Sequence, residues 1–490
     1  MRIRAGGGSS RYQLQITRSE ISSRHAPGIA GRGGGGTLNK SYGVHVNPGV
    51  LYTLGAVATV LLALAGIVIG PGVVAVALGL IAMMFFANRP RPGFILWLVG
   101  TATIPIWAGV DVVAFIAPST AIVIVLIPLL LKHGVWKIGA ADAIVGLFLI
   151  FCLFGAAISD VPPSAIATVM VQWIPAYIVG RALTPTVGRS FVYGAIASVF
   201  AGVGAWAIIE FVLDAHVFET FYGFSDQSFW RTIQSRGGVD RSEAAFGHAI
   251  ALGGALAVGI PFVLVAPFRK RTRVILLLLV GVGIICTFSR GPMLAGAATA
   301  LLAVIFLRKE LGKSFGWGFV LLAGVAGFAL VPRLLEFFNS AGNELADGTN
   351  YRERLFASFF NDLQLIGTAD GVFTDSAGTH YRQYTSIDSA FIDIGLTYGL
   401  LPLGLIIVGI VAIVLGALRG NATPARVAIL GQLPTLFTVA LITQYGAVVW
   451  FVAGIASANA FTNFRQPAPV LTKPNARLAE KHLRRHRQLR

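Results

Sequence analysis

The sequence predicts an all-α integral membrane protein, a polytopic bundle of about 14 transmembrane helices (12–14) with two long extracytoplasmic loops. Only 12% of its 490 residues are charged, whereas soluble domains contain about a quarter. The mean hydropathy is +0.75. Apolar stretches of about 17–25 residues recur along the chain, and each is long enough to cross about 30 Å of hydrocarbon. A soluble enzyme is therefore excluded.

Composition divides the chain into three parts. Residues 1–48 are rich in Gly, Ser and Arg and predict a disordered basic tail, and 464–490 form a second basic tail. The transmembrane domain is expected at 49–463, with outer loops at about 214–246 and 332–395. The first apolar stretch begins near Leu51, after a long polar tail, which is not typical of a cleavable signal peptide. Spans are predicted near 50–69, 72–87, 93–110, 114–131, 138–157, 164–182, 190–213, 247–267, 274–288, 292–307, 315–331, 396–418, 427–444 and 446–463.

The distribution of positive charge predicts the orientation. In this arrangement 30 of the 38 Lys and Arg residues lie in the tails and in the short loops on the same side. Cytoplasmic loops carry such an excess, so we expect a multi-pass protein of the plasma (inner) membrane with both termini cytoplasmic. The net charge of +17 then reflects topology, with some affinity for membrane lipids of negative charge. Nucleic-acid binding is not needed to explain it.

The motif Cys286-Thr-Phe-Ser-Arg-Gly-Pro-Met293 lies between two apolar runs on the predicted outer side. An Arg within a membrane span costs about 2.5–3.5 kcal/mol, so it normally faces a cavity or a partner. The turn at Gly291 and Pro292 would expose backbone N–H groups beside Arg290, which suits an anion such as a diphosphate. Alternatively, Arg290 extends to the lipid headgroups.

The two outer loops supply the other candidates. Arg241 and His248 close the first loop, where Arg offers a bidentate fork for phosphate and His248 either donates to an anion or caps a helix. Arg352 and Arg354 lie in the second loop within Tyr351-Arg-Glu-Arg354. Asp388 ends that loop and is either a general base for a hydroxyl acceptor or a helix cap.

Other chemistries leave no trace in the sequence. It contains no phosphate-binding P-loop, no HExxH motif, no paired Cys residues and no Asp-rich cluster. We therefore expect no cofactor and no metal, and no sugar-nucleotide-dependent catalytic domain on the cytoplasmic side.

Four short motifs in this order resemble the O-antigen ligase and polymerase superfamily of bacterial envelope glycosyltransferases, over roughly residues 170–420. They are Phe246-Gly-His-Ala-Ile-Ala-Leu-Gly253, Thr287-Phe-Ser-Arg-Gly291, Tyr351-Arg-Glu-Arg354, and Asp388 followed by Gly399-Leu-Leu-Pro-Leu-Gly404. The resemblance implies that Arg290 holds the diphosphate of a polyprenyl-linked glycan with help from a loop Arg. Tyr177-Ile-Val-Gly-Arg181 also looks similar to the family, although the predicted topology puts Arg181 at the inner end of its span.

The chain departs from the ligases at one position. Ligases of the superfamily carry a His 11 residues before the Gly of the closing helix, where this chain has Asp388. The resemblance therefore favours a polymerase over a ligase. The expected function is an outward-facing, metal-independent glycosyltransferase in cell-envelope or exopolysaccharide assembly. Its partners would be a polyprenyl-diphosphate-linked glycan donor, a glycan or lipid acceptor and other polysaccharide assembly proteins.

Two alternatives remain open at this point. A transporter or flippase of lipid-linked sugars would also need a cationic cavity, but such proteins typically show internal repeats, and no convincing repeat is visible. A scaffold membrane protein is the third possibility.

Overall fold

The computed structural model describes residues 81–82, 84–86, 88–111, 115–221, 225–236, 238–311, 358–360, 362–375, 378–384 and 387–461. Helices dominate this part of the chain, and its strands form three short two-stranded hairpins. The expected spans at 50–69 and 315–331, most of 72–87 and both basic tails lie outside the described residues. So do Arg352 and Arg354.

Within the described residues, four helices are long and apolar enough to cross a membrane: α5 (Ala140–Ile158), the continuous helix Pro163–Val187, α8 (Arg189–Leu213) and α16 (Leu400–Leu418). The second of these comprises α6 (Pro163–Ala167), the π-helical segment η2 (Thr168–Trp173) and α7 (Ile174–Val187). Both α5 and α16 leave large apolar side chains exposed, including Phe154 and Val411. Such uncovered apolar faces are typical of helices in contact with lipid.

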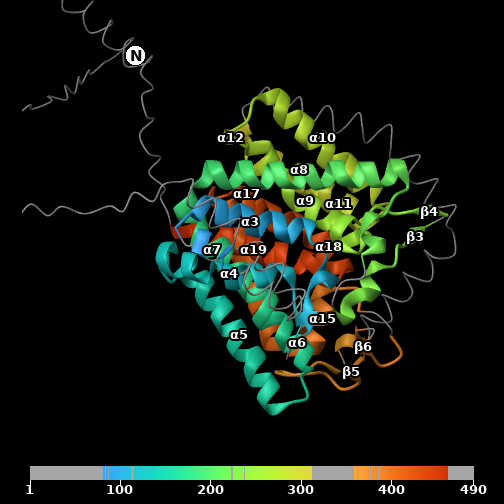
Figure 1. Cartoon of the computed structure of the whole chain (residues 1–490). Helices are drawn as coiled ribbons and strands as arrows, with labels where there is room; N and C mark the ends of the chain where they lie inside the picture. The colour runs from blue at the N-terminus through green and yellow to red at the C-terminus, as the bar shows by residue number, and fades with distance from the viewer. Residues whose placement is uncertain are drawn as a thin grey trace, which may run out of the picture. The chain divides into compact units, whose positions relative to one another are not determined.

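The other α-helices in the described part of the chain are shorter, except α19, which has 19 residues. They are α3 (Pro90–Thr103), α4 (Pro118–His133), α9 (Ala249–Val265), α10 (Lys270–Cys286), α11 (Arg290–Phe306), α12 (Arg308–Leu311), α15 (Ala390–Tyr398), α17 (Pro424–Gly431), α18 (Leu433–Thr438) and α19 (Thr443–Phe461). Figure 1 shows the long helix α8 lying across this bundle, with α9 and α10 beside it, and α11 packs against α9.

Three predicted elements differ from the structure. The span expected at 93–110 ends at Thr103, because Ile104 precedes Pro105 and is extended. The span expected at 427–444 is divided: α18 ends at Thr438, and Val439 is extended. An additional helix, α15, precedes α16 and is separated from it by Gly399, whose φ of 100° favours glycine.

The core is centred on the crossing of α7 and α19, where glycines allow the two backbones to approach closely. A methyl group on Gly180 would lie 2.1 Å from the carbonyl oxygen of Phe451, and one on Gly454 would lie 2.2 Å from that of Tyr177. Aromatic rings fill the space around the crossing, and Trp173 stacks on Trp450 at 5.6 Å between ring centroids. Small residues at an interface let membrane helices pack in this way.

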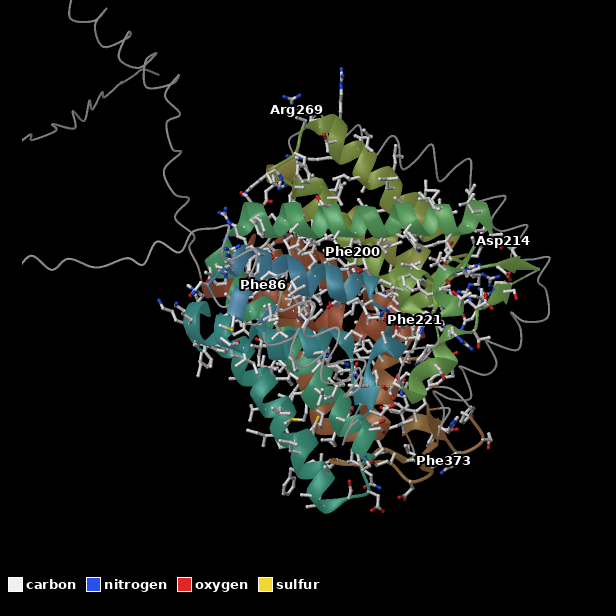
Figure 2. All side chains as sticks on the ribbon, in the orientation of Figure 1. Phe86, Phe200, Asp214, Phe221, Arg269 and Phe373 are labelled. Atoms are coloured by element: carbon white, nitrogen blue, oxygen red, sulfur yellow. The ribbon has the colours of Figure 1, made fainter. Side chains whose placement is uncertain are left out.

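The loops form two groups at opposite ends of the bundle. At one end, the side-chain amide of Gln444 donates to the backbone carbonyls of Ile104 and Ala245. At the same end, the backbone amide of Thr368 donates to Ser159 Oγ. The hairpins β3 (Ser235–Arg236) with β4 (Val239–Asp240) and β5 (Val372–Asp375) with β6 (Gly378–Tyr381) belong to this end. In Figure 2, Asp214, Phe221 and Phe373 lie on that side, whereas Arg269 projects from the turn between α9 and α10. This grouping brings segments 100 or more residues apart into contact.

Candidate functional site

The segment that precedes α9 and the turn that precedes α11 meet at the end of the bundle that carries the hairpins. The Ser242 amide donates to the Cys286 carbonyl at 3.2 Å. Just beyond, a methyl group on Gly253 of α9 would lie 2.6 Å from Cβ of Pro292 in α11. Two of the motifs singled out in the sequence therefore form one structure.

Arg241 joins these two segments from within. Its side chain is buried, and its guanidinium donates to the Thr287 carbonyl at 2.9 Å, to Gln234 Oε1 at 3.0 Å and to Ser289 Oγ. Burial, with the nearby charge of Arg236, lowers the pKa of Arg241 to about 10. The group still carries its proton at neutral pH. Since all three hydrogen-bond partners are neutral, a positive charge is fixed directly beneath the turn 287–289.

Arg236 and Arg290 add two more charges around the same turn. Arg236 ends strand β3 and donates to the Phe288 carbonyl at 3.4 Å. Its charge acts on both Arg241 and Arg290. Arg290 is the first residue of α11 and is only partly buried. Three guanidinium groups so close together repel one another, and an anion bound among them would relieve that repulsion.

His248 supplies a neutral donor at the start of α9. Its Nδ1 accepts a hydrogen bond from the Ile250 amide at 3.1 Å. Because Nδ1 accepts this bond, it carries no proton, and the neutral ring holds its proton on Nε2. His248 thus caps α9 through one nitrogen and offers an N–H group through the other.

Backbone geometry at this site also favours an anion. Both α9 and α11 begin here, with His248 and Ser289 as their N-cap residues, and a helix N-terminus carries partial positive charge. Phe288, which directly precedes the N-cap Ser289, adopts a left-handed φ of 44°. A non-glycine residue in this region is strained and is held by its surroundings, here by stacking on Phe211 at 5.3 Å.

Asp388 lies at the same end of the bundle, next to the residue that follows α18. It precedes Ser389, the N-cap of α15, and the Ala390 amide donates to the Val439 carbonyl at 3.0 Å. On the other side, a methyl group on Gly291 would lie 3.1 Å from Thr438 Oγ1. The end of α18 therefore separates the start of α15 from the start of α11.

Arg181 lies elsewhere. Its guanidinium forms an ion pair with Asp142 at 2.9 Å and donates to the carbonyls of Val135 and Lys137. Asp142 begins α5, whereas the other end of that 19-residue helix, at Ser159, contacts the loop at Thr368. At 1.5 Å per residue, α5 separates the two ends by roughly 25 Å. The structure thus brings Arg241, His248 and Arg290 together and leaves Arg181 at the opposite end.

Sequence reasoning missed Arg236 and Gln234, the two residues that complete the surroundings of Arg241. The side-chain oxygen of Gln234 accepts from Arg241, and the backbone amide of Gln234 donates to Glu243 Oε1 at 3.1 Å. Their only signal was proximity to Arg241 along the chain. No family model matches this chain, and no curated protein sequence matches it. Its function must therefore be argued from the residues themselves.

Proposed function

We propose that this protein is a polytopic plasma-membrane glycosyltransferase that acts on polyprenyl-diphosphate-linked glycans outside the cell, and that it is a polymerase. The supporting observation is the group of three arginines, 236, 241 and 290, around one strained turn at two helix N-termini. Such a group suits a diphosphate, which carries several negative charges and many acceptor oxygens. The motif resemblance to the O-antigen ligase and polymerase superfamily points to the same ligand.

In the proposed reaction, an acceptor hydroxyl oxygen forms a bond to the anomeric carbon of the donor glycan. The bond from that carbon to the diphosphate oxygen breaks, and the lipid diphosphate leaves. Arg290 and Arg236 stabilise the negative charge that grows on the leaving oxygen. Asp388 receives the proton of the acceptor hydroxyl.

Arg241 has a different part in this proposal. Its donors are already engaged by Thr287, Gln234 and Ser289. Arg241 therefore positions the turn that carries Arg290 and adds its charge from beneath. The more accessible Arg290 and Arg236 would contact the diphosphate.

An apolar cavity supports a lipid-linked donor. It has a volume of about 310 Å³ and is lined by side chains of α5, α16 and α19, including Phe148, Ile413 and Trp450. Ala390 and Phe391, which follow Asp388 closely, also line it. A polyprenyl chain that entered this cavity with its diphosphate at the Ala390 end would bring that group toward the start of α15.

The test is the glycan product in cells whose own copy of the gene is deleted and replaced by variants at matched membrane levels. Asp388→Asn removes the negative charge and keeps the shape, so we expect product formation to fall by about 10²–10⁴-fold. Arg290→Lys should also impair it, since an ammonium group cannot reproduce the bidentate fork. Asp370→Asn and Arg419→Lys, both exposed, serve as matched controls and should retain normal product.

The pattern of loss distinguishes the proposed function from its rivals. Loss of a polymerase leaves single repeat units, loss of a ligase leaves long undelivered chains, and loss of a flippase leaves lipid-linked units on the cytoplasmic side. Normal glycan with Asp388→Asn would mean that Asp388 is only part of a helix cap. Normal glycan with both variants would remove the proposed function from this site.

A further inference from the structure

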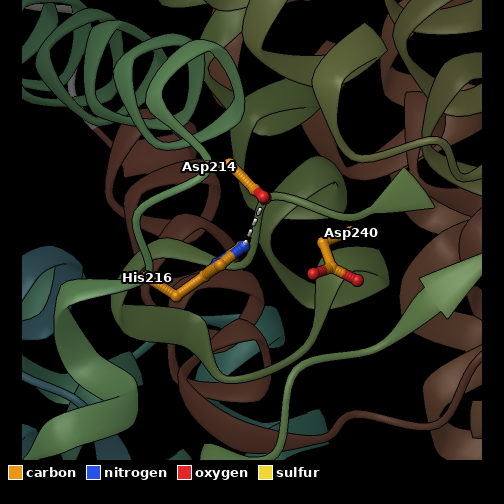
Figure 3. A group of neighbouring side chains, drawn as sticks. All are labelled: Asp214, His216 and Asp240. Carbon is orange, nitrogen blue, oxygen red and sulfur yellow. Dashed lines mark ion pairs between the residues drawn. The ribbon is translucent and has the colours of Figure 1, made fainter. Parts of the chain in front are cut away.

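Two carboxylates and a histidine converge at the end of α8, beside the hairpin β3–β4. Asp214 and His216 follow α8, and Asp240 ends β4 (Figure 3). One ligand atom from each of these residues lies within 4.8 Å of the others. His216 Nε2 and Asp214 Oδ1 are 4.0 Å apart.

The imidazole of His216 is held in one orientation by a residue outside this group. His216 Nδ1 lies 3.0 Å from Oε1 of Glu210, a buried side chain of α8. The other oxygen of Glu210 accepts from the amides of Glu243 and Ala244 at 3.1 and 2.8 Å. A carboxylate fixed in this way accepts a hydrogen bond from Nδ1–H, and in the neutral ring this places the lone pair on Nε2.

That lone pair points at two further acceptors. The His216 side chain is only 7% exposed, so its Nε2 is directed into the space shared with Asp214 and Asp240 and is largely shielded from water. The carboxylates of Asp214 and Asp240 repel each other at this separation, and a cation beside Nε2 would offset that repulsion. A separation of 4.0 Å exceeds a hydrogen bond. Ligand atoms that surround a tetrahedral ion at roughly 2.0–2.2 Å lie about 3.3–3.6 Å apart, so a small rotation of the exposed Asp214 side chain would bring these two atoms into ligand positions.

We propose that Asp214, His216 and Asp240 bind a divalent transition metal, Zn²⁺ or Mn²⁺, with Glu210 orienting the histidine from behind. An imidazole ligand favours these ions over Mg²⁺ and Ca²⁺, which prefer oxygen ligands alone. The two Asp side chains are exposed and can rotate to close the site. This site departs from the sequence-based expectation of no metal.

The metal would connect the residues that follow α8 to the hairpin formed by β3 and β4. Asp214 and His216 belong to the end of α8, whereas Asp240 directly precedes Arg241. A bound ion would therefore tie the hairpin that carries Arg236 and Arg241 to the long helix. The proposal concerns metal binding and stability, and it stands whether or not the protein is a glycosyltransferase.

The experiment uses the purified full-length protein, first stripped of metal with EDTA. Titration calorimetry with Zn²⁺, Mn²⁺ and Mg²⁺, together with metal analysis after desalting, should show one tightly bound Zn²⁺ or Mn²⁺ and much weaker Mg²⁺. Asp240→Asn and His216→Gln should each lower the affinity by at least about 10–100-fold, the effect known for disturbed metal-site residues. Glu219→Gln, an exposed acid in the same segment, should bind like the wild type.

Thermal unfolding separates binding from folding. In EDTA, Asp240→Asn should melt at the same temperature as the wild type, and added Zn²⁺ should stabilise only the wild type and Glu219→Gln. If His216→Gln is unstable, Asp240→Asn decides alone, since the exposed Asp240 side chain contributes little to packing. Equal affinity in the wild type and Asp240→Asn, or no tight binding by the wild type, would overturn the proposal.

Discussion

At the scale of single residues, the buried acid Glu243 shows how the site is held together. Its side chain is 1% exposed, and one oxygen accepts from the Gln234 amide. Burial raises the pKa of Glu243 from 4.5 to about 8, even though Arg241 and two backbone amides oppose the shift. At neutral pH this carboxyl is therefore mainly protonated in the folded protein.

The raised pKa predicts a loss of stability with rising pH. Between pH 4.5 and 8 the folded protein retains a proton that the unfolded chain releases, so this contribution is full below about 4.5 and lost as the pH rises through about 8. Glu243→Gln keeps an acceptor for the Gln234 amide but cannot ionise. We expect the variant to exceed the wild type in melting temperature at pH 8.5 and to match it at pH 4.5. The difference should be on the order of 1 kcal/mol or more, since each unit of pKa corresponds to about 1.4 kcal/mol.

Glu219→Gln provides the control for this measurement, because that side chain is exposed and its neutralisation should leave the pH profile unchanged. A constant difference between Glu243→Gln and the wild type at every pH would contradict the role of ionisation. The effect would then lie in packing.

At the scale of elements, the crossing of α7 and α19 depends on two glycines. Methyl groups on Gly180 and Gly454 would each meet backbone atoms of the facing helix at 2.1–2.2 Å, which side-chain rotation cannot relieve. By contrast, a methyl group on Gly146 of α5 would meet nothing within 4 Å. These positions form a matched set, since all three are glycines within helices.

We expect Gly180→Ala and Gly454→Ala to destabilise the protein by about 1–3 kcal/mol, the usual cost of overpacking. Gly146→Ala should be neutral or slightly stabilising, because alanine favours helix. Thermal unfolding of the purified variants in detergent measures both effects. Equal melting temperatures for all three variants would show that the two backbones can separate without cost.

At the scale of the whole molecule, the two groups of loops should lie on opposite sides of the membrane. Asp370 lies beside the end of α15, just before α16 begins, because the neighbouring Ala369 backbone amide donates to the Leu396 carbonyl, and Asn421 follows the end of α16. Nineteen helical residues separate the two by about 28 Å, close to the thickness of the hydrocarbon layer. The excess of Lys and Arg in the loops on the Asn421 side predicts that this side is cytoplasmic.

Cysteine labelling tests this orientation in intact cells. Both native cysteines, Cys152 and Cys286, are buried, so they should react little with a polar, membrane-impermeant maleimide. Asp370→Cys should be labelled from outside, whereas Asn421→Cys should react only after the membrane is permeabilised. The reverse pattern would invert the topology, and with it the side on which the arginine cluster faces.

Local sequence was sufficient to predict the helical class and, in the described part of the chain, most helix positions. Stretches such as 143–158 and 400–418 are continuously apolar, and burial of apolar surface depends on the residues of the stretch itself. The motif around Arg290 was also visible, because a charge between two apolar runs is costly wherever the chain folds. The neighbouring residues Arg241 and His248 were predicted from a short pattern at the end of a loop, where a helix begins.

The breaks and the convergences were decided by tertiary structure. The end of α18 at Thr438 follows from packing, since Val439 leaves the helix to pair with Ala390, a residue 49 positions earlier. Arg236 entered the site, and Asp240 came to face His216, because the hairpin of the two-residue strands β3 and β4 lies beside the segment that follows α8. Hydropathy is a sum over neighbours in sequence, whereas a site depends on which side chains long-range packing places within a few ångströms. The sequence by itself therefore determined where the helices form, and only the tertiary structure decided which charges meet.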